Sequence, residues 1–442
     1  MEEESPRSPE AKLGLRLEDL WDIQQPQLTP SEKLNSCFES IPVSSFPPAA
    51  PSQVIDITSN SSLAEAVQIL SKHKLLSAPV RNVEAPEDAS WIDRYMGIVE
   101  FAGIAVWLLH QSELAALRMM GGSAGMGLVT GRVAAAVSAA TLGTPPSAIV
   151  GTALVAAAGA GTTAAVGPGH SGPEAAASMG GSFFETLTSS DFYKNTKVQD
   201  ISGSFRWAPF LALQKSDTFL TMLLLLSKYK MKSLPVVDLG EVKIDNIITQ
   251  SAVVHMLAEC VGLHWFENWG KKKLFELGLP IMTRDQLIKV YEEEPVLQVF
   301  KLMRESGIGG LPVVEGSGRK AIGNISIRDV QFLLTAPEIY KNYRSITAKN
   351  FLNVVRVHLE EQHEVSPMLL GTVTCGRDNT IKEVIQRLDT EKIHRIYVVD
   401  KDGNLEGVIT LRDIISKLVH EPRNYFGDFF DGVVPMPQNS RV

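Results

Sequence analysis

The chain has 442 residues, of which 44% are hydrophobic and 21% charged, ordinary values for a globular protein of two or three domains. Its net charge of -8 argues against a nucleic-acid-binding protein, because such a protein normally presents a basic face. The three cysteines form no Cys-x-x-Cys pair and the histidines are scattered, so we expect a reducing compartment, no disulfide and no metal site.

The first 50 residues are rich in proline and serine. We expect residues 1–50 to form an N-terminal tail with one short helical candidate at 30–40. The acidic first four residues are unlike a secretory signal peptide or a transit peptide. We therefore expect a cytoplasmic or nuclear protein.

From residue 55 onwards, one pattern recurs four times, and we number the four copies repeats one to four. Each repeat begins with a helix whose apolar residues are spaced i, i+3, i+4 and i+7, which predicts one buried face. These residues are Leu63/Ala66/Val67/Leu70, Phe219/Met222/Leu223/Leu226, Val296/Val299/Phe300/Met303 and Ile381/Val384/Ile385/Leu388. In repeats one and four, Ser62 with Glu65 and Thr380 with Glu383 are capping-box signatures at the helix start.

Two strands joined by a turn follow each helix, and a second apolar helix closes the repeat. The first strands are expected at 78–80, 234–237, 311–314 and 396–399, and the second at 96–99, 244–249, 321–327 and 405–410. The closing helices are expected at 103–110, 252–260, 329–334 and 413–419. Repeats three and four share a Gly-x-x-[Ser/Thr]-x-x-Asp junction between the last strand and the closing helix.

These elements predict the domain boundaries. We place repeat one at 51–112, repeat two at 195–262, repeat three at 275–336 and repeat four at 364–422. Residues 113–181 are almost entirely Ala, Gly, Ser, Thr and Val, and we expect a disordered or loosely helical insertion there. A transmembrane span is the less favoured alternative, because the segment has few large apolar residues and is broken by Pro145-Pro146.

Two linkers and the C-terminus leave alternatives open. The aromatic run at 264–269 fits either packing between two halves of the molecule or a partner-binding patch, and we favour packing. The cationic stretch at 341–356 fits either a solvated helix, which we favour, or a contribution to a phosphate site. The C-terminal tail, 423–442, carries an aromatic run and is expected to dock on the same chain or on a partner.

The hairpin of repeat four carries polar groups at the ends of its strands. His394 and Arg395 enter its first strand, and Thr410 and Asp413 follow its second, with turn residues at 400–403 between them. A carboxylate suits ribose hydroxyls and the cationic groups suit phosphate, so this arrangement could hold a nucleotide.

The four repeats resemble cystathionine-β-synthase (CBS) motifs, which are β-α-β-β-α modules. The resemblance implies an α+β fold in which the four motifs pair into two Bateman modules that form a disc. Four motifs without an attached catalytic or channel domain resemble the γ regulatory subunit of the AMP-activated, sucrose-non-fermenting kinase family. The segments 85–95, 205–210 and 393–400 look like the plant γ-type subunit.

That resemblance implies a non-catalytic subunit that assembles with a kinase catalytic α subunit and a β scaffold subunit. It implies a role in energy and carbohydrate signalling, with AMP, ADP or ATP as regulatory ligands and no cofactor, nucleic acid or membrane as partner. The alternative is a free-standing CBS-type nucleotide sensor that acts on another enzyme. No P-loop, dinucleotide fingerprint or Ser-His-Asp order indicates an enzyme, so we expect no catalytic residue.

In this family, the Asp of the junction holds ribose and a His-Arg pair before the strand reaches phosphate. The matching residues here are His394, Arg395, Thr410 and Asp413 in repeat four, and Ser326 and Asp329 in repeat three. At the position of the His-Arg pair, repeats one to three have Leu76-Ser77, Lys232-Ser233 and Gly309-Gly310. Gly103 and Ala252 stand at the Asp position in repeats one and two, so two of the four ribose carboxylates are missing.

Overall fold

The computed structural model describes residues 8–24, 27–48, 54–73, 75–101, 103–104, 107–108, 111, 194–201, 211–229, 231–238, 240, 243–340 and 346–426. The predicted insertion at 113–181 lies outside these residues, as do the segments 205–210 and 427–442. No helix in the described part is long and apolar enough to cross a membrane.

Repeats two, three and four have the order β-α-β-β-α expected of a CBS motif, and the described elements of repeat one follow the same order from the first strand to the third. Repeat one contains β1 (Ile57–Thr58), α3 (Leu63–Lys72), β2 (Ser77–Arg81) and β3 (Tyr95–Glu100), and repeat two contains β4 (Leu213–Gln214), α11 (Phe219–Ser227), β5 (Ser233–Asp238), β6 (Lys243–Thr249) and α12 (Gln250–Glu259). Repeat three contains β8 (Val290–Tyr291), α14 (Val296–Ser306), β9 (Gly310–Val314), β10 (Ala321–Ser326), the 3₁₀ turn η4 (Ile327–Val330) and α15 (Gln331–Thr335). Repeat four contains β11 (Thr374–Cys375), α17 (Ile381–Thr390), β12 (Arg395–Val399), β13 (Leu405–Thr410) and α18 (Leu411–Leu418).

Further elements lie within, between and around the repeats. They are α1 (Pro9–Ile23), α2 (Pro30–Glu39), η1 (Val43–Ser45), α4 (Trp91–Arg94), α10 (Val198–Ile201), α13 (His264–Gly270), η2 (Leu274–Leu277), β7 (Met282–Thr283), η3 (Arg284–Gln286), η5 (Pro337–Tyr340), α16 (Ala348–Glu361) and η6 (Pro367–Leu370). In every repeat a further short strand precedes the first helix and is counted from here on as the first strand, so that the two predicted strands become the second and third. The first strand pairs parallel with the second, which pairs antiparallel with the third.

Local sequence signals explain where the first helix of repeats one and four starts. The Ser62 hydroxyl accepts a hydrogen bond from the Glu65 amide, and the Glu65 carboxylate accepts one from the Ser62 amide, which is the predicted capping box. Thr380 and Glu383 make the same reciprocal pair at the start of α17. The apolar faces predicted for α3, α11, α14 and α17 are buried, so the helical spacing was interpreted correctly.

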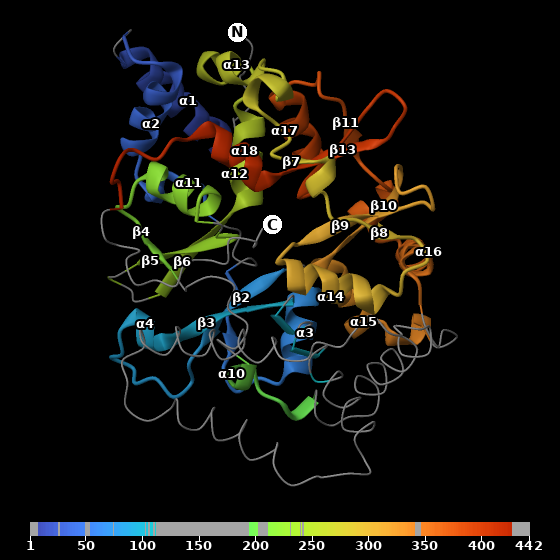
Figure 1. Cartoon of the computed structure of the whole chain (residues 1–442). Helices are drawn as coiled ribbons and strands as arrows, with labels where there is room; N and C mark the ends of the chain where they lie inside the picture. The colour runs from blue at the N-terminus through green and yellow to red at the C-terminus, as the bar shows by residue number, and fades with distance from the viewer. Residues whose placement is uncertain are drawn as a thin grey trace, which may run out of the picture.

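Two hydrophobic cores connect the repeats in an alternating way. One core joins repeats two and four, where α12 packs against α17 and α18 while α11 packs against α18. The other joins repeats one and three, where α3 packs against α15. In Figure 1, the helices of repeats two and four lie together in the upper half and those of repeats one and three in the lower half.

The sheets of repeats three and four make a third kind of contact. β7, which lies within the bounds predicted for repeat three and before β8, pairs antiparallel with β13 of repeat four. A small cluster of Val314, Tyr397, Leu405 and Val408 fills the space between the two sheets. Repeat three therefore contacts repeat four through strands and repeat one through helices. The closed disc implied by the resemblance stays a prediction.

The N-terminal region differs from the expected tail. Residues 9–23 and 30–39 form α1 and α2, and their apolar residues, among them Leu17, Trp21 and Phe38, are buried in the core of repeats two and four. The Glu18 carboxylate accepts hydrogen bonds from the first two amides of α13, at 2.7 and 2.9 Å, and so caps that helix. The described residues 8–24 and 27–48 are thus part of the folded body.

The two segments with alternative interpretations are also placed. In α13 the aromatic residues Trp265, Phe266 and Trp269 are buried in the core of repeats two and four, which supports the packing interpretation. At the C-terminus, the Tyr425 hydroxyl lies 3.0 and 2.9 Å from the hydroxyls of Thr218 and Thr221. The described beginning of the C-terminal tail therefore docks on repeat two of the same chain.

Candidate functional site

A pocket of about 240 Å³, which we call the central pocket, is lined by residues from all four repeats. Most of them come from the same two places in each repeat, the start of the second strand and the end of the third, and others come from the linker between repeats three and four. At the starts these are Leu76, Ser77, Lys232, Ser233, Gly309, His394 and Arg395, and at the ends Glu100, Phe101, Thr249, Gln250, Ser251, Ser326, Arg328, Asp329, Thr410 and Leu411.

The register of the hairpins explains this convergence. The second and third strands run antiparallel, and the pairs at their open ends are Ser77 with Glu100, Ser233 with Thr249, Gly310 with Ser326, and Arg395 with Thr410. The residues before the second strand and the junction after the third strand are therefore neighbours in every repeat. This is why His394 and Arg395 lie beside Thr410 although 15 residues or more separate them in the chain.

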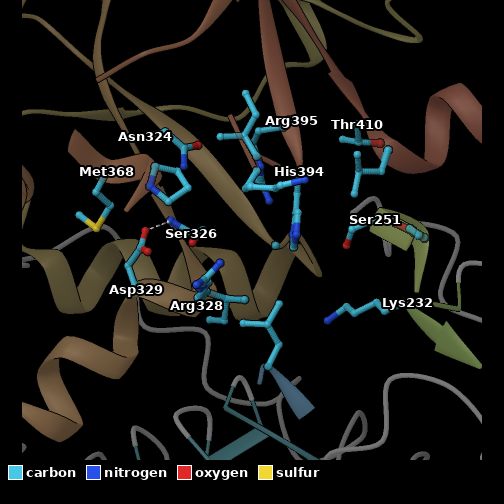
Figure 2. A pocket seen from close by; sticks show the side chains of 18 of the residues that line it. Lys232, Ser251, Asn324, Ser326, Arg328, Asp329, Met368, His394, Arg395 and Thr410 are labelled. Atoms are coloured by element: carbon cyan, nitrogen blue, oxygen red, sulfur yellow. Dashed lines mark hydrogen bonds between the residues drawn. The ribbon is translucent and has the colours of Figure 1, made fainter. Parts of the chain in front are cut away.

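The central pocket is rich in cationic groups. Among the described residues that line it are the five cations Lys232, Arg328, Arg356, Lys392 and Arg395, and the two carboxylates of Glu100 and Asp329. Figure 2 shows the side chains of Lys232 and Arg328 extending toward the space beneath His394 and Arg395. Such a cluster favours an anionic ligand.

His394 has an uncharged ring at neutral pH. Burial, and then the positive charges of Arg395, Arg328 and Lys232, lower its pKa to about 4. An anion bound among these cations would offset their repulsion and raise the pKa of His394 again.

The two predicted ribose carboxylates share one local geometry. Asp329 and Asp413 are 5% and 8% exposed, and each accepts a hydrogen bond at Oδ2 from the backbone amide three residues before it, at 2.7 and 2.8 Å. The Thr410 hydroxyl also donates to Asp413 Oδ2 at 2.8 Å. Both residues are the acidic partners of capping boxes, so they have a structural role whether or not a ligand binds.

Burial raises the pKa of both Asp329 and Asp413, against the lowering effect of their hydrogen bonds to Ser326 and Thr410. Each capping hydrogen bond uses Oδ2. In the described part of the chain, Oδ1 of neither carboxylate accepts a hydrogen bond. One oxygen of each carboxylate is therefore available to a ligand hydroxyl.

Asp413 lies outside the central pocket. It lines a neighbouring pocket of about 300 Å³, which we call the Asp413 pocket, together with mainly apolar residues of repeats three and four. Its lining is Ile281, Met282, Gln286, Leu287, Ile288, Ile308, Gly310, Pro312, Arg395, Tyr397, Val408, Thr410, Arg412 and Asp413. Arg395, Tyr397 and Thr410 line both pockets, so the two are adjacent.

Of the six residues proposed from the sequence, the structure brings His394, Arg395, Thr410, Ser326 and Asp329 together around the central pocket. It adds Lys232 and Arg328, which sequence reasoning missed. Lys232 occupies the position of His394 in repeat two, and Arg328 directly precedes the Asp of the repeat-three junction. Both cations were therefore visible at positions that the motif alignment had already marked.

The linker between repeats three and four also contributes. Arg356 of α16 lines the central pocket, and its Nε donates a hydrogen bond to the Met368 carbonyl of η6 at 3.0 Å. The favoured interpretation of 341–356 as a merely solvated helix is therefore incomplete, because this cation faces the pocket. Residues 341–345 lie outside the described part.

Within the described residues, no group of three or more His, Cys, Asp or Glu side chains is arranged to hold a metal ion. Cys37, Cys260 and Cys375 are buried and form no disulfide.

Comparisons with known proteins place the chain among CBS proteins. A family model described as "CBS domain" matches residues 278–335 and 365–420. The chain is 62% identical over 436 residues to the SNF1-related protein kinase regulatory subunit gamma-1 of Arabidopsis thaliana, covering 98% of this chain and 95% of that protein. It is 43% identical to the gamma-1-like protein of the same plant, covering 89% of each. A solved archaeal protein from Methanocaldococcus jannaschii, described as a homolog of the AMPK γ subunit, is 14% identical with a TM-score of 0.48, covering 83% of this chain and 97% of that one.

Proposed function

This chain belongs to the family of SNF1-related protein kinase gamma regulatory subunits, and we propose that ligand binding in the central pocket of this chain regulates such a kinase. The chain is a non-catalytic regulatory subunit of a protein kinase. The ligand we propose is an adenine nucleotide: AMP, ADP or ATP.

The observation that carries this proposal is the convergence of all four repeats on one cationic pocket. Five cations against two carboxylates suit the phosphate groups of a nucleotide. Each repeat contributes strand ends to the pocket wall. A ligand in the pocket would therefore contact strands that pack on both hydrophobic cores.

The Asp413 pocket suits the nucleoside part of the same ligand. Its walls include Leu287, Ile288 and Pro312, which offer an apolar surface to a base. The free oxygen of Asp413 would accept hydrogen bonds from ribose hydroxyls. Arg395 borders both pockets, so phosphates attached to that ribose would extend past it toward Lys232 and Arg328.

Regulation requires that the ligand binds two states of the complex with different affinity. The central pocket is suited to this because it lies where all four repeats meet, and small changes in their packing alter the spacing of its cations. We propose that the bound ligand biases the surface that the chain offers to the kinase.

The partners we propose are a catalytic α subunit and a β scaffold subunit, in the cytoplasm or the nucleus. Co-expression of the three chains followed by size-exclusion chromatography should give one complex with equal amounts of each. A chain that stays monodisperse and separate in the presence of α and β subunits would contradict this proposal. If that separate chain still bound nucleotide, the free-standing sensor would become the better explanation.

Nucleotide binding is tested by isothermal titration calorimetry. The full-length chain, in its complex with the α and β subunits, is titrated with AMP, ADP and ATP in turn. Asp413→Asn keeps the size and the capping ability of the side chain but removes its charge, and we expect it to weaken binding by at least about tenfold. Glu383→Gln is the matched control, because Glu383 has the same capping-box role in α17 and lines neither pocket. Equal affinity in wild type and Asp413→Asn would overturn the role of Asp413 as a ribose ligand.

A further inference from the structure

One of the four strand ends at the central pocket carries a charge where the others carry a hydroxyl. Thr249, Ser326 and Thr410 end the third strands of repeats two, three and four, and Glu100 ends that of repeat one. The threonine hydroxyls cap the next helix, accepting from the amides three residues later at 3.1 and 3.3 Å. Glu100 instead directs its carboxylate toward another repeat.

The partner of Glu100 is Lys232 of repeat two. Lys232 Nζ lies 3.5 Å from Glu100 Oε2, and the two side chains are 39% and 26% exposed. Lys232 occupies the position that His394 occupies in repeat four, directly before the second strand. Neither Arg328 nor Arg395 forms an ion pair with a carboxylate of the described residues, so Lys232 differs from these two cations in having an internal anion beside it.

We propose that Glu100 acts as an internal anion that limits how much negative charge the central pocket accepts, so that it is a specificity-determining residue. This inference rests on the proposed binding of nucleotide phosphates in that pocket. A phosphate that reaches Lys232 must displace the Glu100 carboxylate or lie beside a like charge. The penalty grows with the number of phosphates, so wild type disfavours ATP relative to AMP.

The test compares wild type with Glu100→Gln, using isothermal titration of the full-length chain with AMP, ADP and ATP. We expect ATP to bind about tenfold more tightly to the variant, a gain of the size of one charge-assisted hydrogen bond, and AMP to gain less. Glu84→Gln is the matched control, because Glu84 is an exposed carboxylate of the same hairpin outside the pocket, and it should leave all affinities unchanged.

A second substitution at Glu100 distinguishes a change in ATP affinity from a loss of folding stability. Glu100→Thr introduces the residue that ends the third strand in repeats two and four, so it should reproduce the gain in ATP affinity while thermal unfolding shows a folded chain. Combining Glu100→Gln with Lys232→Met should abolish most of the gain, since the relieved cation is then absent. A gain that persists undiminished in the double variant would show that Glu100 does not act through Lys232.

The outcomes separate this inference from the proposed function. If wild type binds nucleotides and Glu100→Gln binds them with the same affinities, the inference fails and the proposed function stands. If only the variant binds, the inference is supported, and the wild-type pocket is blocked by its own carboxylate. If neither protein binds AMP, ADP or ATP, both the inference and the nucleotide site are overturned.

Discussion

Acidification should destabilise this protein through His394. In the fold, burial and the nearby charges of Arg395, Arg328 and Lys232 lower the pKa of His394 from 6.5 to about 4. Between these two pH values the unfolded chain binds a proton that the folded chain does not, so the free energy of unfolding falls as pH falls. Well above pH 6.5 the imidazole is neutral in both states, and this contribution to stability is constant.

The size of the effect follows from the two pKa values. Lowering the pH from 7 to 5 should remove about 2 kcal/mol of stability through this one group. Asp329 and Asp413 act in the opposite direction, because burial raises their pKa and the fold then binds protons more readily than the unfolded chain. A comparison between wild type and a variant that lacks only the imidazole separates His394 from both carboxylates.

The assay is urea unfolding followed by fluorescence at pH 7, 6 and 5, with wild type and His394→Gln. The difference in unfolding free energy between the two proteins should change by about 2 kcal/mol between pH 7 and pH 5, with wild type losing more. Saturating inorganic phosphate should reduce this difference, because a bound anion raises the pKa of His394. Parallel pH profiles for the two proteins would refute the assignment of a buried neutral imidazole.

Three further changes test contacts that hold the fold and the site. Glu18→Ala removes the acceptor of two backbone amides at the start of α13 and should lower the free energy of unfolding by about 1–2 kcal/mol, measured by urea unfolding, whereas Glu18→Asp should recover part of it. Tyr425→Phe removes a hydroxyl shared with two threonines at the start of α11 and should cost about 1 kcal/mol, and hydrogen exchange of the α11 amides should rise. Gly310→Ala places a methyl group against the Arg395 guanidinium. It should weaken the binding of inorganic phosphate, measured by isothermal titration, without a large change in thermal stability. Unchanged phosphate binding would contradict the placement of Arg395.

The sequence alone predicted the repeat architecture well because the signals involved are local. Helical spacing marked the buried faces of α3, α11, α14 and α17, and capping residues marked the starts of α3 and α17. The last hairpin was placed correctly, since β-branched runs and an Asp-Gly turn specify strand and turn over a few residues.

The missed elements had weaker local signals. In α1 the buried residues Leu13, Leu17 and Trp21 are spaced by four and follow Ser8, whose hydroxyl caps the helix. That pattern could have been found, but the proline- and serine-rich surroundings suggested a tail. Only packing against the core of repeats two and four makes burial of this face favourable, because a single amphipathic helix of this length is marginal alone.

The sequence by itself determined which residues stand at the ends of the strands in each repeat, and therefore which side chains were candidates for a site. Tertiary structure decided which of them meet. Packing of the repeats brings Lys232 and Arg328 beside His394, directs Glu100 of repeat one toward Lys232, and places Asp413 in the neighbouring pocket. Local propensities act over a few residues along the chain, whereas these contacts depend on how four separate sheets pack through two hydrophobic cores, which no single repeat encodes.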